Sequence, residues 1–220
     1  MQKFAIYDMD KTITRRATFP GFLRFAGLRI APVRQLLWPL VGLFLLGYAL
    51  KLVSRGRLKE LMHGALLGPR LDPARLAQVA EDFASHIIAT GLFDAAHAQI
   101  AADRAEGCRM VMATASFHYY ASAVGELLGF ETIATNSQRD QHNLVLPLIA
   151  GENCYGPAKL RMIEAWLAAQ GLPREALDIR FYSDHVSDQP VLDWADKGYA
   201  VNADARMKLL AVKQGWPLRW

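Results

Sequence analysis

Residues 3–14 read Lys-Phe-Ala-Ile-Tyr-Asp-Met-Asp-Lys-Thr-Ile-Thr, and this stretch decides the fold that we expect. A short apolar run that ends in Asp8 is typical of a buried strand, and open α/β sheets bind ligands where their strands end. A carboxylate at that place can attack phosphorus as a nucleophile. Asp10, two residues further on, can protonate a leaving oxygen and then activate water. The stretch predicts a catalytic pair with a positioning hydroxyl, Thr12, although a plain polar turn is the alternative interpretation.

Two later segments can supply phosphate-binding groups. Residues 109–116 form another apolar strand pattern, which ends in Thr114, Ala115 and Ser116. A hydroxyl at a strand end, followed by backbone amides that enter a helix, is suited to holding a phosphate oxygen. Residues 156–159 (Gly-Pro-Ala-Lys) open an amphipathic helix and place Lys159 near its N-terminus. A lysine there offers a positive charge to a phosphoryl group and to an ionised Asp8.

A third segment can supply a metal site. Residues 179–188 repeat the arrangement of a strand followed by acidic residues, here Asp184 and Asp188. Together with Asp8 and Asp10, these carboxylates are candidate ligands for Mg²⁺, which prefers oxygen donors and keeps several waters. Each segment alone is a weak signal. Their order, with each at a strand end or a helix start, predicts one phosphoryl-transfer site.

With all four segments in place, the chain resembles the haloacid dehalogenase superfamily (subfamily IB), in particular the branch that contains phosphoserine phosphatase. The resemblance covers essentially the whole chain and implies that Asp8 is the nucleophile and Asp10 the general acid/base. Lys11 stands where that family most often has glycine. The residues that the resemblance assigns to substrate and phosphate binding are Thr12, Thr114, Ala115 and Lys159. It also implies that the Asp8 carboxylate, the Asp10 carbonyl and Asp184 hold Mg²⁺, and that Asp188 supports the metal waters or Lys159.

The pattern of elements predicts the fold class. Strand-like segments near 3–8, 109–113, 179–183 and 198–202 alternate with helical ones, which is typical of a parallel sheet with crossover helices. We therefore expect an α/β protein: a Rossmann-like parallel sheet with flanking helices and an inserted α-helical cap. The expected catalytic core comprises residues 1–14 and 100–220, and the expected cap comprises residues 15–99. Two cysteines predict no disulfide framework, and the early acids argue against a secretory signal.

Charge is distributed unevenly along the chain. Residues 1–59 carry eleven of the 25 Lys and Arg residues but only two acids, Asp8 and Asp10. No acidic side chain lies between Lys11 and Lys59, and this stretch contains the apolar run 36–53, which reads first as a membrane segment. One complete crossing would separate Asp8 from its partners across the bilayer. We therefore expect a helix or shallow helical hairpin that lies in the membrane interface, with basic residues at the headgroups.

Two alternatives to membrane contact exist for this run. The run can be the buried core of a helical cap, but a buried helix does not explain the basic, acid-free surround. Nucleic acid is not expected as a partner, because a run of eighteen positions that is apolar except for Lys51 does not form a nucleic-acid groove. The oligomeric state stays open.

The combined features predict an Mg²⁺-dependent phosphomonoester hydrolase that acts on a membrane lipid phosphate, with Arg15 and Arg16 as candidates for holding a second phosphate. Within the superfamily the pattern resembles phosphatidylglycerophosphatase C, whose substrate is phosphatidylglycerophosphate. The expected location is the cytoplasmic face of the inner membrane, with a cytoplasmic protein as the alternative. The alternative functions are a soluble phosphatase for a small ester such as phosphoserine, and a membrane-docked protein of the same fold without catalysis.

Overall fold

The computed structural model describes residues 1–220 and contains one seven-stranded sheet in the order β4-β3-β2-β1-β5-β6-β7. All neighbouring strands pair in parallel except β3 and β4, which form an antiparallel pair at one edge. The strands are β1 (Gln2–Tyr7), β2 (Arg109–Phe117), β3 (Glu131–Arg139), β4 (Val145–Ala150), β5 (Leu177–Ser183), β6 (Lys197–Val201) and β7 (Leu218–Arg219). The predicted α/β class with a mainly parallel sheet is confirmed.

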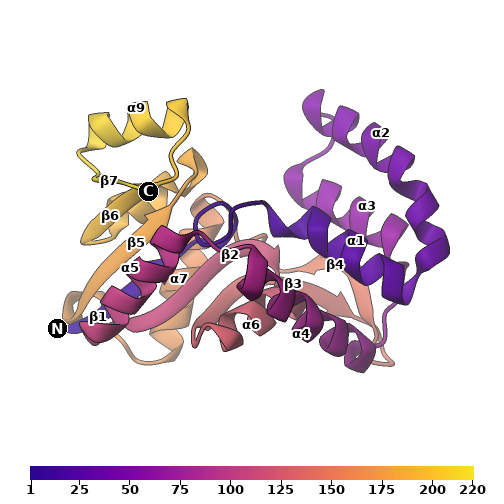
Figure 1. Cartoon of the computed structure of the whole chain (residues 1–220), viewed down its shortest axis with the longest axis horizontal. Helices are drawn as coiled ribbons and strands as arrows, with labels where there is room; N and C mark the ends of the chain where they lie inside the picture. The colour runs from indigo at the N-terminus through magenta and orange to yellow at the C-terminus, as the bar shows by residue number, and fades with distance from the viewer.

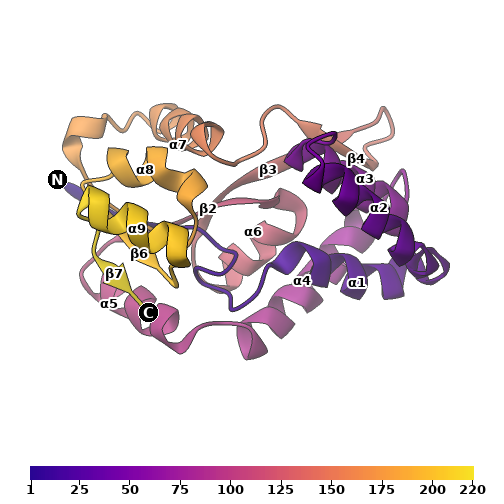
Figure 2. The same ribbon diagram turned by 90° about the horizontal axis from the view of Figure 1, so that it is seen from above.

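Helices cover both faces of this sheet, because the central strand β1 is buried on both sides. Phe4 and Ile6 pack into one core with α7, α8 and α9, whereas Ala5 and Tyr7 pack into a second core with α4, α5 and α6. Figure 2 shows these two helical layers on opposite sides of the strands. The helices are α4 (Pro73–Thr90), α5 (Asp94–Ala105), α6 (His118–Leu127), α7 (Pro157–Ala169), α8 (Gln189–Trp194) and α9 (Ala205–Gln214).

A buried ionic network ties α5 to the centre of the sheet. Asp103 of α5 is fully buried and accepts hydrogen bonds from the Tyr7 hydroxyl (2.5 Å) and the Arg180 guanidinium (2.6 Å). Tyr7 belongs to β1 and Arg180 to β5, so both strands that carry acidic residues at their ends are held by the same carboxylate. A buried charge of this kind is tolerated because it is both paired and hydrogen-bonded.

The inserted helices gather at the β3–β4 end of the molecule (Figure 1). They are α1 (Thr18–Ile30), the 3₁₀ helix η1 (Pro32–Leu37), α2 (Trp38–Ala49) and α3 (Arg55–Leu66). Two further 3₁₀ turns, η2 (Arg174–Ala176) and η3 (Val186–Asp188), flank β5. Within the predicted cap range, α4 returns along α6 and α5 packs on the sheet. The division into a core and a cap at residues 15–99 stays a prediction.

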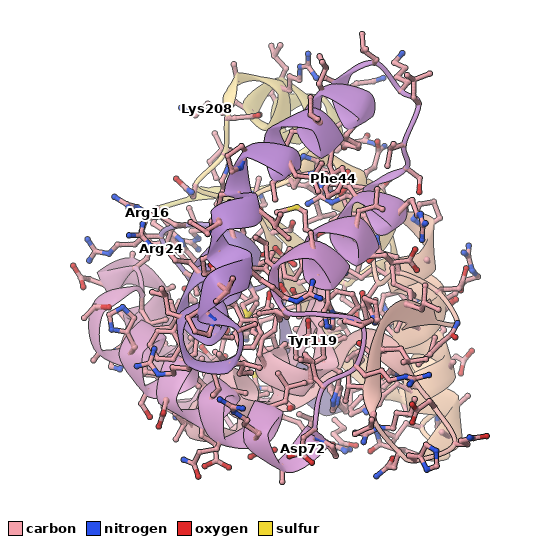
Figure 3. The ribbon with its side chains drawn as sticks, turned by 90° about the vertical axis from the view of Figure 1, so that its right-hand side faces the viewer. Arg16, Arg24, Phe44, Asp72, Tyr119 and Lys208 are labelled. Atoms are coloured by element: carbon pink, nitrogen blue, oxygen red, sulfur yellow. The ribbon has the colours of Figure 1, made fainter.

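The apolar run forms η1 and α2, and most of its side chains are exposed. Only Val41 of α2 is buried, while Trp38 and Phe44 pack partly against the core; Figure 3 shows Phe44 between α2 and α3. Leu43, Leu46 and Leu50 are 63%, 55% and 61% exposed. The continuous helical stretch Pro32–Ala49 is long and apolar enough to cross a membrane, by length and composition only. A helix that is apolar all round is normally buried in a protein core or a membrane. Here Val41 is the one buried residue of α2, so within this chain the run is not a buried cap core.

Candidate active site

Parallel pairing brings the predicted residues to one edge of the sheet. Tyr7 of β1 lies beside Met112 of β2 and beside Tyr182 of β5, so these three strands end at the same level. The residues that follow surround a cavity of about 190 Å³. Of the predicted site residues, Asp8, Asp10, Thr114, Ala115, Lys159, Asp184 and Asp188 all line this cavity.

A lysine bridges two buried carboxylates at the centre of the site. The Lys159 ammonium lies 2.8 Å from Asp8 Oδ1 and 2.6 Å from Asp188 Oδ2, and its side chain is 2% exposed. Burial alone would lower the pKa of Lys159, but the carboxylates of Asp188 and Asp8 outweigh it and raise that pKa. Burial, aided by Asp188 and Asp184, raises the pKa of Asp8, and Lys159 opposes this rise. The geometry holds a carboxylate and a cation together at the strand end, as phosphoryl transfer needs.

The start of α7 explains how the lysine reaches this position. Gly156 precedes the helix with φ 59° and ψ −136°, a conformation that glycine adopts and residues with a Cβ avoid. Pro157 then occupies the first helical position, where a missing N–H costs nothing. The backbone N–H of Lys159 donates to the Gly156 carbonyl, so the lysine lies in the first turn. The predicted helix start at residues 156–159 is confirmed.

Asp10 is held by a polar network that the sequence did not indicate. Its Oδ1 accepts hydrogen bonds from the backbone N–H and the hydroxyl of Thr18, both at 2.7 Å, and its Oδ2 accepts one from Ser116 at 3.2 Å. The Tyr120 hydroxyl donates to Ser116 at 2.6 Å and lies 3.1 Å from the Thr18 hydroxyl. Because Thr18 begins α1, the network links the candidate acid/base directly to the first inserted helix.

Thr12 positions Asp184 from outside the cavity. The Asp184 backbone N–H donates to the Thr12 hydroxyl at 3.0 Å, and Thr12 is fully buried and does not line the cavity. Between these strand-end residues, Lys11 has φ 59°, in the left-handed region that favours glycine. The lysine therefore carries a modest backbone strain at the position where the resembling family most often has glycine. Its carbonyl accepts a hydrogen bond from Asn202 at 3.0 Å, which helps to hold this turn.

A second buried lysine supports the Thr114–Ala115 segment and was not predicted. Lys59 of α3 donates to the Ala115 carbonyl and to Asn153 Oδ1, the latter at 3.0 Å, and is 7% exposed. Burial, with a smaller contribution from Arg55, lowers the pKa of Lys59 to about 7. The only sequence signal was a lysine inside an amphipathic helix, which is usually solvent-exposed. The contact shows that α3 positions the candidate phosphate-binding loop.

Arg15 and Arg16 lie elsewhere, which corrects their expected place beside the reaction centre. The Arg15 guanidinium contacts Asp94 at 3.1 Å and the Leu92 carbonyl at 2.6 Å. Both arginines line a separate cavity of about 540 Å³ between α1 and α4, and Figure 3 shows Arg16 and Arg24 projecting outward on that side. The turn after Thr14 directs them away from the site, because the Arg15 backbone N–H donates to the Gly91 carbonyl. Closeness to Asp8 in sequence did not translate into closeness in space.

The carboxylates of the site fit a hard divalent cation. Asp188 Oδ1 is buried and has no hydrogen-bond partner, which is rare for a buried oxygen in a native protein. Burial, together with Asp188, raises the pKa of Asp184 to about 6, so excess negative charge surrounds these oxygens. No three Asp, Glu, His or Cys side chains in the chain form a ready metal-binding cluster. Mg²⁺ at this site would be held by one or two carboxylates, a carbonyl and several waters.

The comparisons with known proteins agree with this geometry. Residues 5–193 match the family described as haloacid dehalogenase-like hydrolase. A phosphoserine phosphatase of Mycobacterium tuberculosis is 24% identical over 146 residues, 66% of this chain and 47% of that protein, so the chain spans about half of that relative. A probable phosphatase of the same organism is 24% identical over 219 residues, covering 97% of this chain and 74% of that one.

A solved structure extends the likeness to the whole fold. A protein from Bordetella pertussis superimposes with a TM-score of 0.83 at 21% identity, over 99% of this chain and 98% of that one. The family match begins in β1 and runs past the Asp8–Lys159–Asp188 centre into α8, so it includes every residue of the candidate site. This chain therefore belongs to the haloacid dehalogenase-like hydrolase family.

Proposed function

We propose that this protein is a phosphomonoester hydrolase that works through an aspartyl-phosphate intermediate. The contact between Lys159 and Asp8 carries the proposal, because it places a cation beside a carboxylate that faces an open cavity. One Asp8 oxygen attacks phosphorus, and the bond from phosphorus to the ester oxygen breaks. Asp10 gives its proton to the departing alkoxide, and the alcohol leaves. Asp10 then takes a proton from water, whose oxygen attacks phosphorus and releases phosphate from Asp8.

The remaining groups bind and orient the phosphoryl oxygens. Lys159 neutralises the charge that develops on them, and the Thr114 hydroxyl with the Ala115 backbone amide supplies hydrogen bonds. Thr12 acts through Asp184, because its hydroxyl accepts a hydrogen bond from the Asp184 backbone N–H at 3.0 Å. Asp8, Asp184 and the Asp10 carbonyl would hold Mg²⁺, which withdraws negative charge from a bound phosphoryl group. Asp188 would orient Lys159, whose ammonium donates a hydrogen bond to Asp188 Oδ2.

The proposed substrate is a membrane lipid phosphate such as phosphatidylglycerophosphate. Two features support it: the exposed apolar helix α2 and the absence of acidic residues from Lys11 to Lys59. The acids that line the cavity are Asp8, Asp10, Asp184 and Asp188, all with roles in the chemistry above. A substrate ammonium would have no acidic partner left. Phosphoserine is therefore the second candidate, favoured by the phosphoserine phosphatase among the relatives of this chain.

A substrate comparison tests the two candidates. We expect Mg²⁺-dependent phosphate release from phosphatidylglycerophosphate in mixed micelles to exceed release from phosphoserine by at least about 100-fold in kcat/KM, since an unpaired buried ammonium costs several kcal/mol. Asp8→Asn serves as the blank. Equal or faster turnover of phosphoserine would reject the lipid substrate and leave the phosphatase chemistry in place.

The proposed location is the cytoplasmic face of the inner membrane, with α2 as the element that contacts the bilayer. The exposed leucines of α2 would enter the interface between headgroups and acyl chains, with Trp38 and Tyr48 as anchors. Of the basic side chains that flank the run, Arg57 is 56% exposed and would meet anionic headgroups, whereas Arg34 donates to the Gly64 and Ala65 carbonyls and Arg55 lines the catalytic cavity. This arrangement keeps the strand-end site on one side of the bilayer.

Three leucine substitutions test the role of α2. We expect the triple variant Leu43→Gln, Leu46→Gln, Leu50→Gln to bind anionic phospholipid vesicles at least about 100-fold more weakly in a sedimentation assay, because each leucine loses apolar burial in the interface. The fold should persist, since all three side chains are mainly exposed.

A matched control uses exposed leucines far from α2. Leu127, Leu209 and Leu218 are 56%, 75% and 48% exposed and lie in α6, α9 and β7. Their change to glutamine should leave vesicle binding unaltered. If both triple variants bind vesicles as the parent does, α2 does not contact the membrane. A change in the sedimentation-equilibrium mass of the α2 variant without lipid would show that a second copy covers this helix instead.

A further inference from the structure

An apolar cavity adjoins the candidate active site between α1, α2 and α3. It has a volume of about 210 Å³, and its apolar walls are Phe19 and Pro20 of α1, Leu45 and Tyr48 of α2, and Leu58 and Met62 of α3. Three of these side chains, Phe19, Leu58 and Met62, are buried in the main core. A concave, largely apolar cavity with a few polar groups at one end is the usual form of a ligand site.

The inner end of this cavity opens onto the reaction centre. Asp10, Ala17, Arg55 and Ala115 line both this cavity and the catalytic one, so the two spaces share a boundary. Asp10 is the candidate proton donor to the leaving oxygen. The group that departs with that oxygen must therefore extend on the Asp10 side, which is the side of the apolar cavity.

The outer end meets the exposed face of α2. Leu45 lines the cavity and is 49% exposed. Tyr48, one turn further along α2, also lines the cavity and is 39% exposed. Apolar surface thus continues from the core residue Met62 through Leu45 to the exposed leucines of α2. An alkyl chain that left the cavity here would remain in contact with the apolar side chains of α2.

We propose that this cavity binds the alkyl portion of the leaving alcohol and is a specificity site for phosphate esters with an aliphatic chain. The inference rests on the proposed phosphatase function and deepens it. The polar side chains that line it, Asp10, Arg55, Lys59 and Ser116, gather at the inner end: Asp10 and Arg55 also line the catalytic cavity, Lys59 donates to the Ala115 carbonyl, and Ser116 donates to Asp10. The other lining residues are apolar except for the Tyr48 hydroxyl. A short polar ester would leave the apolar wall of the cavity exposed to water, whereas each methylene added to the ester would remove further apolar surface from water.

A series of monomeric alkyl phosphates tests the cavity apart from any membrane. With butyl, hexyl and octyl phosphate below their micelle concentrations, we expect kcat/KM of the parent protein to rise about threefold per methylene, which is roughly 50- to 100-fold from butyl to octyl. The gain should level off once the cavity is filled. A flat series with measurable turnover of all three esters would overturn the inference and leave the phosphatase function standing. No turnover of any ester would instead reject the proposed function.

Substitutions assign the effect to the cavity wall. The double variant Leu45→Gln, Met62→Gln should reduce the gain from butyl to octyl phosphate to about tenfold or less, because glutamine keeps the length of methionine but adds a polar group. Leu45→Gln alone changes an exposed side chain and should lower the gain without a cost to folding. The matched control is Leu127→Gln in α6, which is 56% exposed and lies outside both α2 and the cavity wall. The same chain-length gain in all three variants would show that the alkyl group binds elsewhere.

Discussion

Replacing Asp8 with asparagine is expected to lower kcat for any phosphomonoester by at least about 10⁴-fold, the scale of loss when a nucleophile is removed. In the parent protein the Lys159 ammonium donates to Asp8 Oδ1 at 2.8 Å. The amide oxygen of asparagine can still accept this hydrogen bond, but the neutral amide cannot attack phosphorus. The fold should remain intact, since asparagine has nearly the same volume. The substitution also removes one carboxylate from a crowded group in which Asp188 and Asp184 raise the pKa of Asp8.

Phosphate release and urea unfolding of the same preparation measure both parts of this expectation. The matched variant is Asp94→Asn, a carboxylate that pairs with Arg15 outside the catalytic cavity and should retain parental turnover. Turnover by Asp8→Asn within tenfold of the parent protein would show that Asp8 is not the nucleophile.

Replacing Lys159 with methionine is expected to lower kcat by about 10²- to 10³-fold, the typical loss of one preorganised charge-stabilising group. It should also destabilise the protein by about 3–5 kcal/mol, since it leaves two buried carboxylates without their cation. Those carboxylates, Asp8 and Asp188, now lie 2.8 and 2.6 Å from the ammonium.

A compensating substitution separates the two effects of the Lys159 change. In the double variant Lys159→Met, Asp188→Asn, one carboxylate is removed with the cation, so most of the stability should return while turnover stays low. Urea unfolding and phosphate release again provide the measurements. Recovery of turnover along with stability would mean that Lys159 only balances charge in the fold and does not act on the phosphoryl group.

The sequence was most informative where chemistry follows a strand directly. The apolar run before Asp8 predicted β1, and the runs before Thr114 and Asp184 predicted β2 and β5. Because parallel strands ending at one level bring such residues together, their common cavity followed from topology. The antiparallel pair β3–β4 was not predicted, because the polar residues of 131–139 lack the continuous apolar pattern of a buried strand.

The supporting contacts of the site could not be predicted from the sequence. Thr18 bonds to Asp10 across a turn whose path no local pattern determines, and Lys59 reaches Ala115 from 56 residues away. Arg15 shows the reverse case, because a nearby position in sequence suggested a role that the turn after Thr14 prevents. Such contacts depend on how the inserted helices dock, and docking is set by packing rather than by any short motif.

The exposure of α2 also needed the structure. The apolar composition of residues 36–53 is compatible with a buried helix as well as with a helix that faces a membrane, and the basic, acid-free flanks favoured the membrane. The position of α2 on the outside of α3 leaves most of its leucines uncovered, and the cavity beneath it connects that face with Asp10. This placement is the reason that the proposed substrate carries an alkyl chain.

The most direct test of the account is to trap the covalent intermediate. The protein is mixed with Mg²⁺ and an alkyl phosphate labelled with ³²P, quenched in acid during turnover, and digested for peptide mapping. We predict one labelled peptide, the one that contains Asp8, with the label released by hydroxylamine as expected for an acyl phosphate; Asp8→Asn should give none. A label on any other residue, or the same label in Asp8→Asn, would contradict the central claim that Asp8 carries the phosphoryl group.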